Sequence, residues 1–339
     1  MIVIGTDAHK RSHCCQAVVA ATGELRSSEA VAATGAGNER LLAWARGADA
    51  ERVWAIEDCR NVSGKLERFL LARGERVVRV PPSLMAGRRR AARTPGKSDP
   101  IDALSVARAA IEEGIENLPS ASLQGPEREI KFLLDHREDL VAERTRTQNR
   151  LRWLLHDRWP ELELPSGCLD RLVWLERISG RLQRAPQEAD VRVMRAQLRR
   201  LRELKREADA LERELGELVA AQQPKLLELP GIGVMGAAKL ITEVAGIERF
   251  SSPAKLARMA GVAPVPASSG ATHRHRLDRG GNRQLNAALH RMAITQVRCH
   301  RPAQDYVARK IASGKTKREA IRCLKRQLVR TVFKTMQPA

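Results

Sequence analysis

Apolar residues in the first eighty positions form short runs separated by longer stretches with a different spacing. The runs, which predict strands, lie at 1–6, 14–20, 53–56 and 76–80. The first two runs predict a β-hairpin. Apolar residues spaced three or four apart predict helices near 38–46 and 66–70, and a third strand before the first helix is left open. Strands that alternate with helices predict an α/β sheet.

The middle of the chain carries a longer helical pattern. Apolar residues recur at helical spacing over 127–155 and again over 187–221, with breaks at 159–160 and 164–167. In the second stretch the spacing alternates between three and four, as in a coiled-coil seam of roughly three heptads. The seam consists of Leu201, Leu204, Ala208, Leu211, Leu215 and Leu218. Two interpretations stay open: a helical hairpin within one chain, and an arm that joins two copies.

The last third is predicted to be mainly helical. The segment 229–246 resembles a helix-hairpin-helix element, in which Gly231 and Gly233 would present backbone N–H groups to a phosphate. A final helix is predicted over 303–336. Its predicted core stripe is Tyr306, Ile311, Ile321, Leu324, Leu328, Val329 and Phe333. Its cations, expected to face nucleic acid or solvent, are Lys315, Lys317, Arg318, Arg322, Lys325, Arg326 and Arg330.

These patterns together predict a fold of class α/β plus all-α. The three predicted domains span 1–122, 123–221 and 222–339. The first is the α/β sheet, the second a long helical coiled-coil arm, and the third a mainly helical domain.

Charge points to a polyanionic partner. The 339 residues include 60 Lys and Arg against 40 Asp and Glu, a formal net charge of +20 with an isoelectric point near 10.6. From residue 222 to the end, 22 Lys and Arg stand against 6 Asp and Glu, so 16 of the 20 excess charges lie there. Nucleic acid is the expected partner, and the last third is its expected binding surface.

Several classes of protein are disfavoured by what the sequence lacks. The six cysteines show no C-x-x-C pairing, and neither a signal peptide nor a long apolar run is present, which predicts a reducing, cytoplasmic setting without a membrane. No G-x-x-x-x-G-K-[ST] motif supports an ATP-driven mechanism. His9 and His13 are four residues apart, but no cysteine pair accompanies them, so zinc is not expected.

Four carboxylates form the candidate chemical site. Asp7 and Glu57 each end a predicted strand, where sites in open α/β sheets form. Asp99 and Asp102 lie three apart at a predicted helix start, so both can face one small object. On local evidence alone an ordinary helix start, with Asp99 as N-cap, Pro100 at N1 and Asp102 at N3, is the favoured interpretation. Four converging carboxylates would repel one another unless hard cations such as Mg²⁺ bind there.

A basic run precedes this acidic pair. It consists of Arg88, Arg89, Arg90, Arg93 and Lys97. The run is either a solvated loop or a contact for a phosphate backbone, and its position beside metal-binding carboxylates favours backbone contact.

The order of the four acids resembles a known family. The segments that carry the match are 4–7, 55–58 and 93–103, the last being the most specific. They are similar to the DEDD tetrad of the RuvC-like, RNase H-type domain at the amino end of one family of insertion-sequence transposases. Pilin-gene invertases are relatives of that family, and some of its members are bridge-RNA-guided recombinases. The resemblance implies an RNase H fold with two Mg²⁺ ions, or Mn²⁺ instead, held by Asp7, Glu57, Asp99 and Asp102.

The segment 260–285 resembles the carboxyl-terminal transposase domain of the same family. In that domain a serine before glycine lies ahead of a basic segment containing Gly-Asn. The resemblance makes Ser269 the nucleophile, with Ser268 as the alternative, although Ser-Ser-Gly alone is a common turn sequence. The basic residues expected to bind nucleic acid here are Arg274, Arg276, Arg279 and Arg283.

The resemblance implies a recombinase that cuts and rejoins donor and target DNA through a phosphoserine intermediate, so that rejoining needs no ATP. It also implies a structured non-coding guide RNA and a homodimer or homotetramer with a composite site. One rival is a RuvC-like structure-specific endonuclease that uses metal-activated water. A second is a non-catalytic nucleic-acid-binding protein. A tyrosine recombinase would need Tyr306, the single tyrosine, whose amphipathic setting favours core packing.

Overall fold

A computed structural model describes residues 1–57, 60–82, 84–85, 98–118, 125–267, 275–278 and 281–338. The chain forms two compact units, one made of residues 1–125 with 243–339 and the other of residues 126–242.

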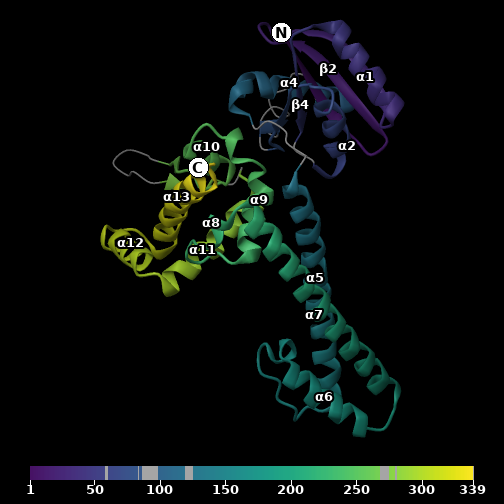
Figure 1. Cartoon of the computed structure of the whole chain (residues 1–339), viewed down its shortest axis with the longest axis vertical. Helices are drawn as coiled ribbons and strands as arrows, with labels where there is room; N and C mark the ends of the chain where they lie inside the picture. Colours follow the sequence, from purple (N-terminus) through teal and green to yellow (C-terminus); the bar gives the residue numbers. More distant parts are fainter. Residues whose placement is uncertain are drawn as a thin grey trace. The chain divides into compact units, whose positions relative to one another are not determined.

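The first unit begins with a five-stranded sheet (Figure 1). Its strands are β1 (Ile2–Ala8), β2 (Ser12–Val19), β3 (Leu25–Ala32), β4 (Arg52–Glu57) and β5 (Val77–Val80). They lie in the order β3-β2-β1-β4-β5. The first three are joined antiparallel, and β1, β4 and β5 run parallel. The predicted hairpin and the two later strands are confirmed, and β3 fills the position left open.

Helices cover both faces of this sheet. Helices α1 (Gly35–Ala48) and α2 (Arg60–Leu71) pack on the face that carries Ile2, Ile4 and Trp54. Helix α4 (Asp99–Glu113) packs on the opposite face against alternate residues such as Val3. Successive side chains of a strand point to opposite faces, so β1 is apolar on both sides because both are covered. This three-layer arrangement is consistent with the predicted RuvC-like domain.

The second unit is a helical hairpin. Helices α5 (Pro126–Arg158) and α7 (Ala189–Gln222) lie side by side, with α6 (Leu172–Arg184) packed at one end (Figure 1). The predicted seam faces this contact, since Leu201, Leu204, Ala208 and Leu215 are buried. The hairpin interpretation is therefore confirmed. The role of the arm in joining two copies stays a prediction.

The glycine turn predicted at 229–236 lies at the end of this unit. It connects the short α8 (Pro224–Leu227) to α9 (Val234–Val244). Gly231 has φ +79°, a conformation that favours glycine, and Gly233 directly precedes α9. The turn and the second helix are confirmed, while α8 spans only 4 residues, so the helix-hairpin-helix assignment stays a prediction.

The rest of the first unit is mainly helical. Its elements are η1 (Ile115–Asn117), η3 (Ile247–Arg249), α10 (Pro253–Met259), β6 (Val265–Pro266), β7 (His275–Arg276), α11 (Arg283–Cys299), α12 (Arg301–Ala312) and α13 (Lys317–Met336). Strands β6 and β7 pair antiparallel. None of the helices in the described part of the chain is long and apolar enough to cross a membrane.

Three predictions for the end of the chain are wrong. The single helix over 303–336 is two helices, because Gly314 at φ +85° ends one and a capping box of Thr316 with Glu319 begins the next. Ile311, placed in the core stripe, is 44% exposed because it lies in the last turn of α12. Lys325, placed on the outer face, is 5% exposed.

Candidate functional site

Two of the predicted acids lie at one edge of the sheet. Strands β1 and β4 are parallel neighbours with Thr6 opposite Ile56, so the residues that follow, Asp7 and Glu57, lie at adjacent strand ends. Asp7 is 8% exposed, and Glu57 is half-buried. The carboxyl edge of parallel strands is where α/β sheets form their sites, so this placement suits chemistry.

Helix α4 carries the other two acids, Asp99 and Asp102, in its first turn, and neither of them is the N-cap residue. Ser98 is the N-cap residue, and its carbonyl accepts the N–H of Asp102 at 3.0 Å. Asp99 is therefore the first residue of the helix, and the prediction that it is the N-cap is wrong by one position. Asp102 is buried, and Asp99 is exposed. The helix start still suits both, since its N–H groups favour nearby carboxylates.

A glycine sets the distance between this helix and the sheet. A Cβ added to Gly5 of β1 would lie 2.1 Å from the carbonyl oxygen of Ala103 and 2.5 Å from the backbone nitrogen of Ala107. Only a residue without a side chain lets β1 and α4 approach this closely. The acids carried by the two elements are brought together by that approach.

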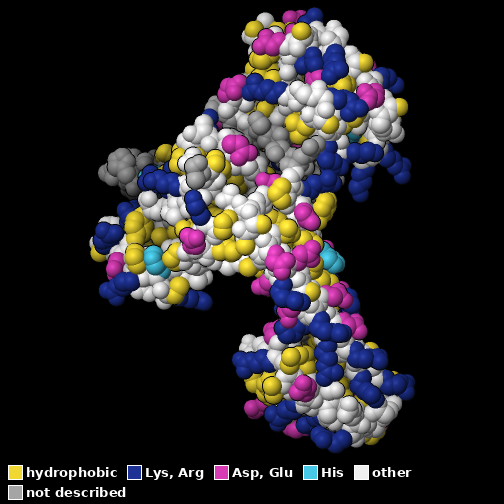
Figure 2. Space-filling model, in the orientation of Figure 1, with side chains coloured by type: hydrophobic (Ala, Val, Ile, Leu, Met, Phe, Trp, Pro, Cys, Tyr) yellow, Lys and Arg dark blue, Asp and Glu magenta, His cyan; other side chains and the backbone are white. Residues whose placement is uncertain are grey.

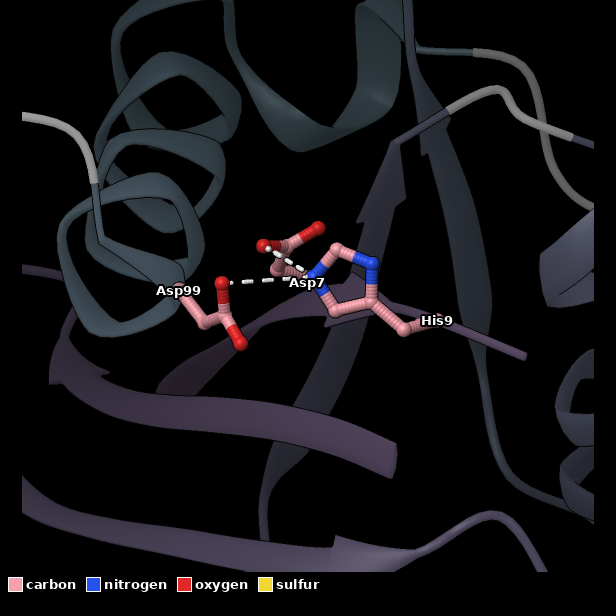
Figure 3. Close-up of side chains that lie close together, drawn as sticks. All are labelled: Asp7, His9 and Asp99. Atoms are coloured by element: carbon pink, nitrogen blue, oxygen red, sulfur yellow. Dashed lines mark hydrogen bonds and ion pairs between the residues drawn. The ribbon is translucent and has the colours of Figure 1, made fainter. Parts of the chain in front are cut away.

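The structure adds a histidine that the sequence did not assign to this site. His9 Nε2 lies 3.1 Å from Oδ2 of Asp7 and 3.4 Å from Oδ1 of Asp99 (Figure 3). One ligand atom from each of these residues lies within 4.8 Å of the others. The one signal that could have found His9 is its spacing of two residues from Asp7, since side chains two apart share one side of an extended chain.

The electrostatics of the cluster favour a cation. The pKa of Asp7 is raised, first by burial and then by the charges of Asp102 and Asp99, while His9 acts in the opposite direction. Burial and the two neighbouring acids penalise the ionised carboxylate of Asp7, and a bound cation would offset that penalty. Carboxylate oxygens suit Mg²⁺ or Mn²⁺, and an imidazole nitrogen suits Mn²⁺ better than Mg²⁺. The side chains present therefore fit a divalent metal ion.

Most residues predicted to contact nucleic acid lie outside the described residues. These are Arg88, Arg89, Arg90, Arg93, Lys97, Arg274 and Arg279, together with the candidate nucleophiles Ser268 and Ser269. Arg276 on β7 and Arg283 at the start of α11 are described and exposed. Lys and Arg side chains also gather at the end of the arm around α6 (Figure 2).

Two family models match separate parts of the chain. The model for the DEDD transposases of IS110, described as a transposase, matches residues 4–160. The model described as the transposase IS116/IS110/IS902 family matches residues 223–308. The first match contains all four predicted acids, and the second contains Ser269.

Proteins of bacterial insertion elements are similar along the chain. Over 250 residues, 60% of this chain, it is 30% identical to a 43.6 kDa protein of element IS110 from Streptomyces coelicolor, and it spans 62% of that protein's length. It is 27% identical to a 44.8 kDa protein of IS116 from Streptomyces clavuligerus, over 97% of this chain and 92% of that one. It is 25% identical to a 42 kDa protein of IS900 from Mycobacterium paratuberculosis, over 97% and 94%.

Proposed function

The chain belongs to the IS110/IS116/IS900 family of transposases, and from that premise we propose that it moves an insertion sequence by a metal-dependent exchange of DNA strands through a covalent protein–DNA intermediate. The observation that carries the metal-dependent part is the convergence of Asp7 and Asp99, from a strand end and a helix start, around His9. A polyanionic substrate also matches the net charge of +20.

The carboxylates of Asp7, Glu57, Asp99 and Asp102 hold the metal ions in this proposal, with Mg²⁺ as the expected ion and Mn²⁺ as the alternative. When bound, such ions neutralise the phosphodiester and stabilise the attacking and leaving oxygens. The burial of Asp7 and Asp102 favours this role, because electrostatic interactions are stronger in a site with a low effective dielectric constant.

Ser269 is the proposed nucleophile, with Ser268 as the alternative. The serine hydroxyl loses its proton as Oγ forms a bond to the phosphorus and the P–O bond to the deoxyribose breaks, and the released sugar oxygen takes up a proton. Attack by a DNA hydroxyl then reverses the step and frees the serine. Because the bond to serine conserves the phosphodiester energy, rejoining needs no nucleotide cofactor.

The partners follow from the same proposal. Donor and target DNA are held by their backbones, and a structured non-coding guide RNA selects the sequences. The acids and Ser269 lie far apart in the chain, so a composite site formed in a homodimer or homotetramer would join them. The helical arm is a suitable element for building that oligomer.

Trapping the covalent intermediate tests this proposal. The protein is incubated with element-end DNA, candidate guide RNA and Mg²⁺ or Mn²⁺, and protein–DNA adducts are separated on a denaturing gel and mapped by mass spectrometry. An adduct at Ser269 or Ser268 that is lost in the matching alanine variant and in Asp102→Asn supports the proposal. Ser251→Ala, an exposed serine of the same unit, is the matched control.

Two results would replace the proposal. Strand cleavage that survives Ser268→Ala and Ser269→Ala, and that leaves no adduct, would identify a RuvC-like endonuclease that uses water. Nucleic-acid binding that is indifferent to Asp102→Asn, with no cleavage under any condition, would identify a binding protein.

A further inference from the structure

A lysine is buried in the carboxyl-terminal part of the first unit. Lys325 on α13 is 5% exposed, and its Nζ donates to Oδ1 of Asn286 on α11 at 2.7 Å. Among the described residues no carboxylate lies within salt-bridge distance of this ammonium, and its pKa is lowered by burial and by Arg322. A buried charge without a counter-ion is costly, and an apolar side chain would pack there at lower cost. The position therefore calls for a role beyond packing.

That role concerns the orientation of an amide. Because Oδ1 of Asn286 accepts the lysine proton, its Nδ2 points the other way and donates to the carbonyl oxygens of Ala260 and Gly261, at 2.8 and 3.0 Å. These two residues form the turn after α10. Lys325 thus fixes which end of the amide faces the turn, since an ammonium can only donate.

A second asparagine holds the same turn from the helix start. Oδ1 of Asn282 caps α11 by accepting the N–H groups of Gln284 and Leu285. Its own N–H donates to the carbonyl of Met259 at 2.6 Å, and its Nδ2 donates to Glu243 at 2.7 Å. Asn282 and Asn286, one helical turn apart, therefore hold consecutive residues of the chain that leads away from α10.

The backbone leaves little freedom at this contact. A Cβ at Gly281 would lie 2.1 Å from the backbone nitrogen of Gly261, and Gly261 itself has φ +62°. The chain continues from this turn through β6 to Ser268 and Ser269. The turn at 260–261 is therefore a rigidly held part of the chain, and the segment that contains the proposed nucleophile follows it in sequence.

We propose that Lys325 is a positioning residue, which acts through Asn286 to hold the 260–261 turn and thereby the segment that leads to Ser269. The inference rests on the proposed function in assigning Ser269 as the nucleophile, but the anchoring of the turn stands by itself. Neither residue needs to contact DNA. We name Asn286, Lys325 and the two carbonyl groups of the turn the amide clamp.

Two variants test the clamp. Lys325→Met keeps the volume but removes the donor, and Asn286→Asp keeps the shape but replaces the Nδ2 donor by an oxygen that repels the carbonyl groups. In both variants, amide hydrogen exchange over 260–263, whose N–H groups bond to residues 256–258, should rise about tenfold. Adduct formation should fall about 100-fold, because a small misplacement of a reacting group costs that much.

The controls separate positioning from folding. Lys334→Met removes an exposed lysine of the same helix and should change neither exchange nor adduct formation. Lys325→Met should keep the melting temperature, since it removes an unpaired buried charge. A merely structural lysine would instead lower the melting temperature and leave the rate of the folded fraction unchanged.

Each outcome decides one question. Unchanged exchange over 260–263 in Lys325→Met and Asn286→Asp overturns the clamp, whatever the adduct yield. Raised exchange with a normal adduct rate overturns its link to the nucleophile. If the wild-type protein forms no adduct while exchange rises in the variants, the serine mechanism is wrong and the clamp is supported as an anchor of the turn.

Discussion

Nε2 of His9, directly after the end of β1, lies 3.1 Å from Oδ2 of Asp7, two residues earlier in the chain. The imidazole also approaches Asp99, so it stands between the two carboxylates. It can therefore hold the acids together as a hydrogen-bonding partner, or serve as a nitrogen ligand once a metal is bound. The two roles predict different metal preferences, because only a nitrogen ligand would favour Mn²⁺ over Mg²⁺.

His9→Ala tests whether the imidazole is a ligand. A nitrogen ligand supports Mn²⁺ more than Mg²⁺, so the variant should lose about 10- to 100-fold in Mn²⁺ affinity and much less in Mg²⁺ affinity. Isothermal titration calorimetry with each ion measures the difference. His156→Ala, an exposed histidine on α5, is the control. Equal losses for the two ions would assign His9 to holding the carboxylates only.

Asp7→Asn should stabilise the metal-free protein at neutral pH. The pKa of Asp7 is raised from 3.8 by burial and by neighbouring acids, so the folded state binds a proton more tightly than the unfolded state. Protonated Asp7 does not destabilise the folded state, so the protein loses stability as the pH rises from 3.8 through the raised pKa. Above the raised pKa, the cost of burying the ionised carboxylate is present in full. The asparagine removes the penalty.

Thermal melts in the presence of a chelator measure this effect. The gain in melting temperature of Asp7→Asn should be constant at neutral pH and shrink as the pH falls through the raised pKa. Added Mn²⁺ should raise the melting temperature of the wild type but not that of the variant. A variant that is less stable than the wild type without metal would show that the hydrogen bond to His9 outweighs burial.

Gly5→Ala should lower both the stability of the protein and its affinity for metal, although Gly5 is not a metal ligand. Its Cβ would overlap the backbone of α4 at Ala103 and Ala107, so the helix must move. Overpacking of this kind costs about 1–3 kcal/mol of stability, and displacement of α4 should weaken metal binding as well. Urea denaturation and metal titration measure the two effects.

Gly47→Ala is the matched control for this variant. Gly47 lies in α1 with no atom within 4 Å of an added Cβ, so alanine there should be neutral or stabilising by about 0.5–1 kcal/mol. If both variants behave alike, the close approach of β1 and α4 does not set the geometry of the metal site.

The elements that depend on local hydrophobic pattern could be predicted from the sequence. The strands of the sheet and the acids at their ends follow from apolar runs and the residue that ends each run, as with Asp7 on β1 and Glu57 on β4. Strand β3 gave a weak signal because it is a polar edge strand with one buried residue, Val31. The long helices were found because their apolar positions face each other along the whole hairpin.

Features that depend on long-range contacts were not predictable. Lys325 falls on the predicted polar pattern of α13, and it is buried where α13 packs against other helices, among them α11, which carries Asn286, 39 residues away. His9 joined the site because α4 carries Asp99 to it from 90 positions later in the sequence. A charge in a sequence says nothing about which distant element will cover it.

The buried pair of Glu67 on α2 and Arg79 on β5 is a further feature of this kind. Their side chains are 0% and 1% exposed, and Nε and Nη2 of the arginine donate to one carboxylate oxygen at 3.0 and 2.8 Å. The other oxygen accepts from Ser63 at 2.5 Å. The pair connects α2 to the strand beside β4, which carries Glu57.

Removing one partner should be far more harmful than removing both. Glu67→Leu removes the carboxylate that accepts two hydrogen bonds from the buried guanidinium and should cost about 3–5 kcal/mol of unfolding free energy. The double variant Glu67→Leu with Arg79→Leu should recover most of that loss, because apolar residues can fill the space without a desolvation penalty. Urea denaturation of the two variants gives the comparison. A single variant that costs less than about 1 kcal/mol would mean that water or another group reaches Arg79 when Glu67 is gone.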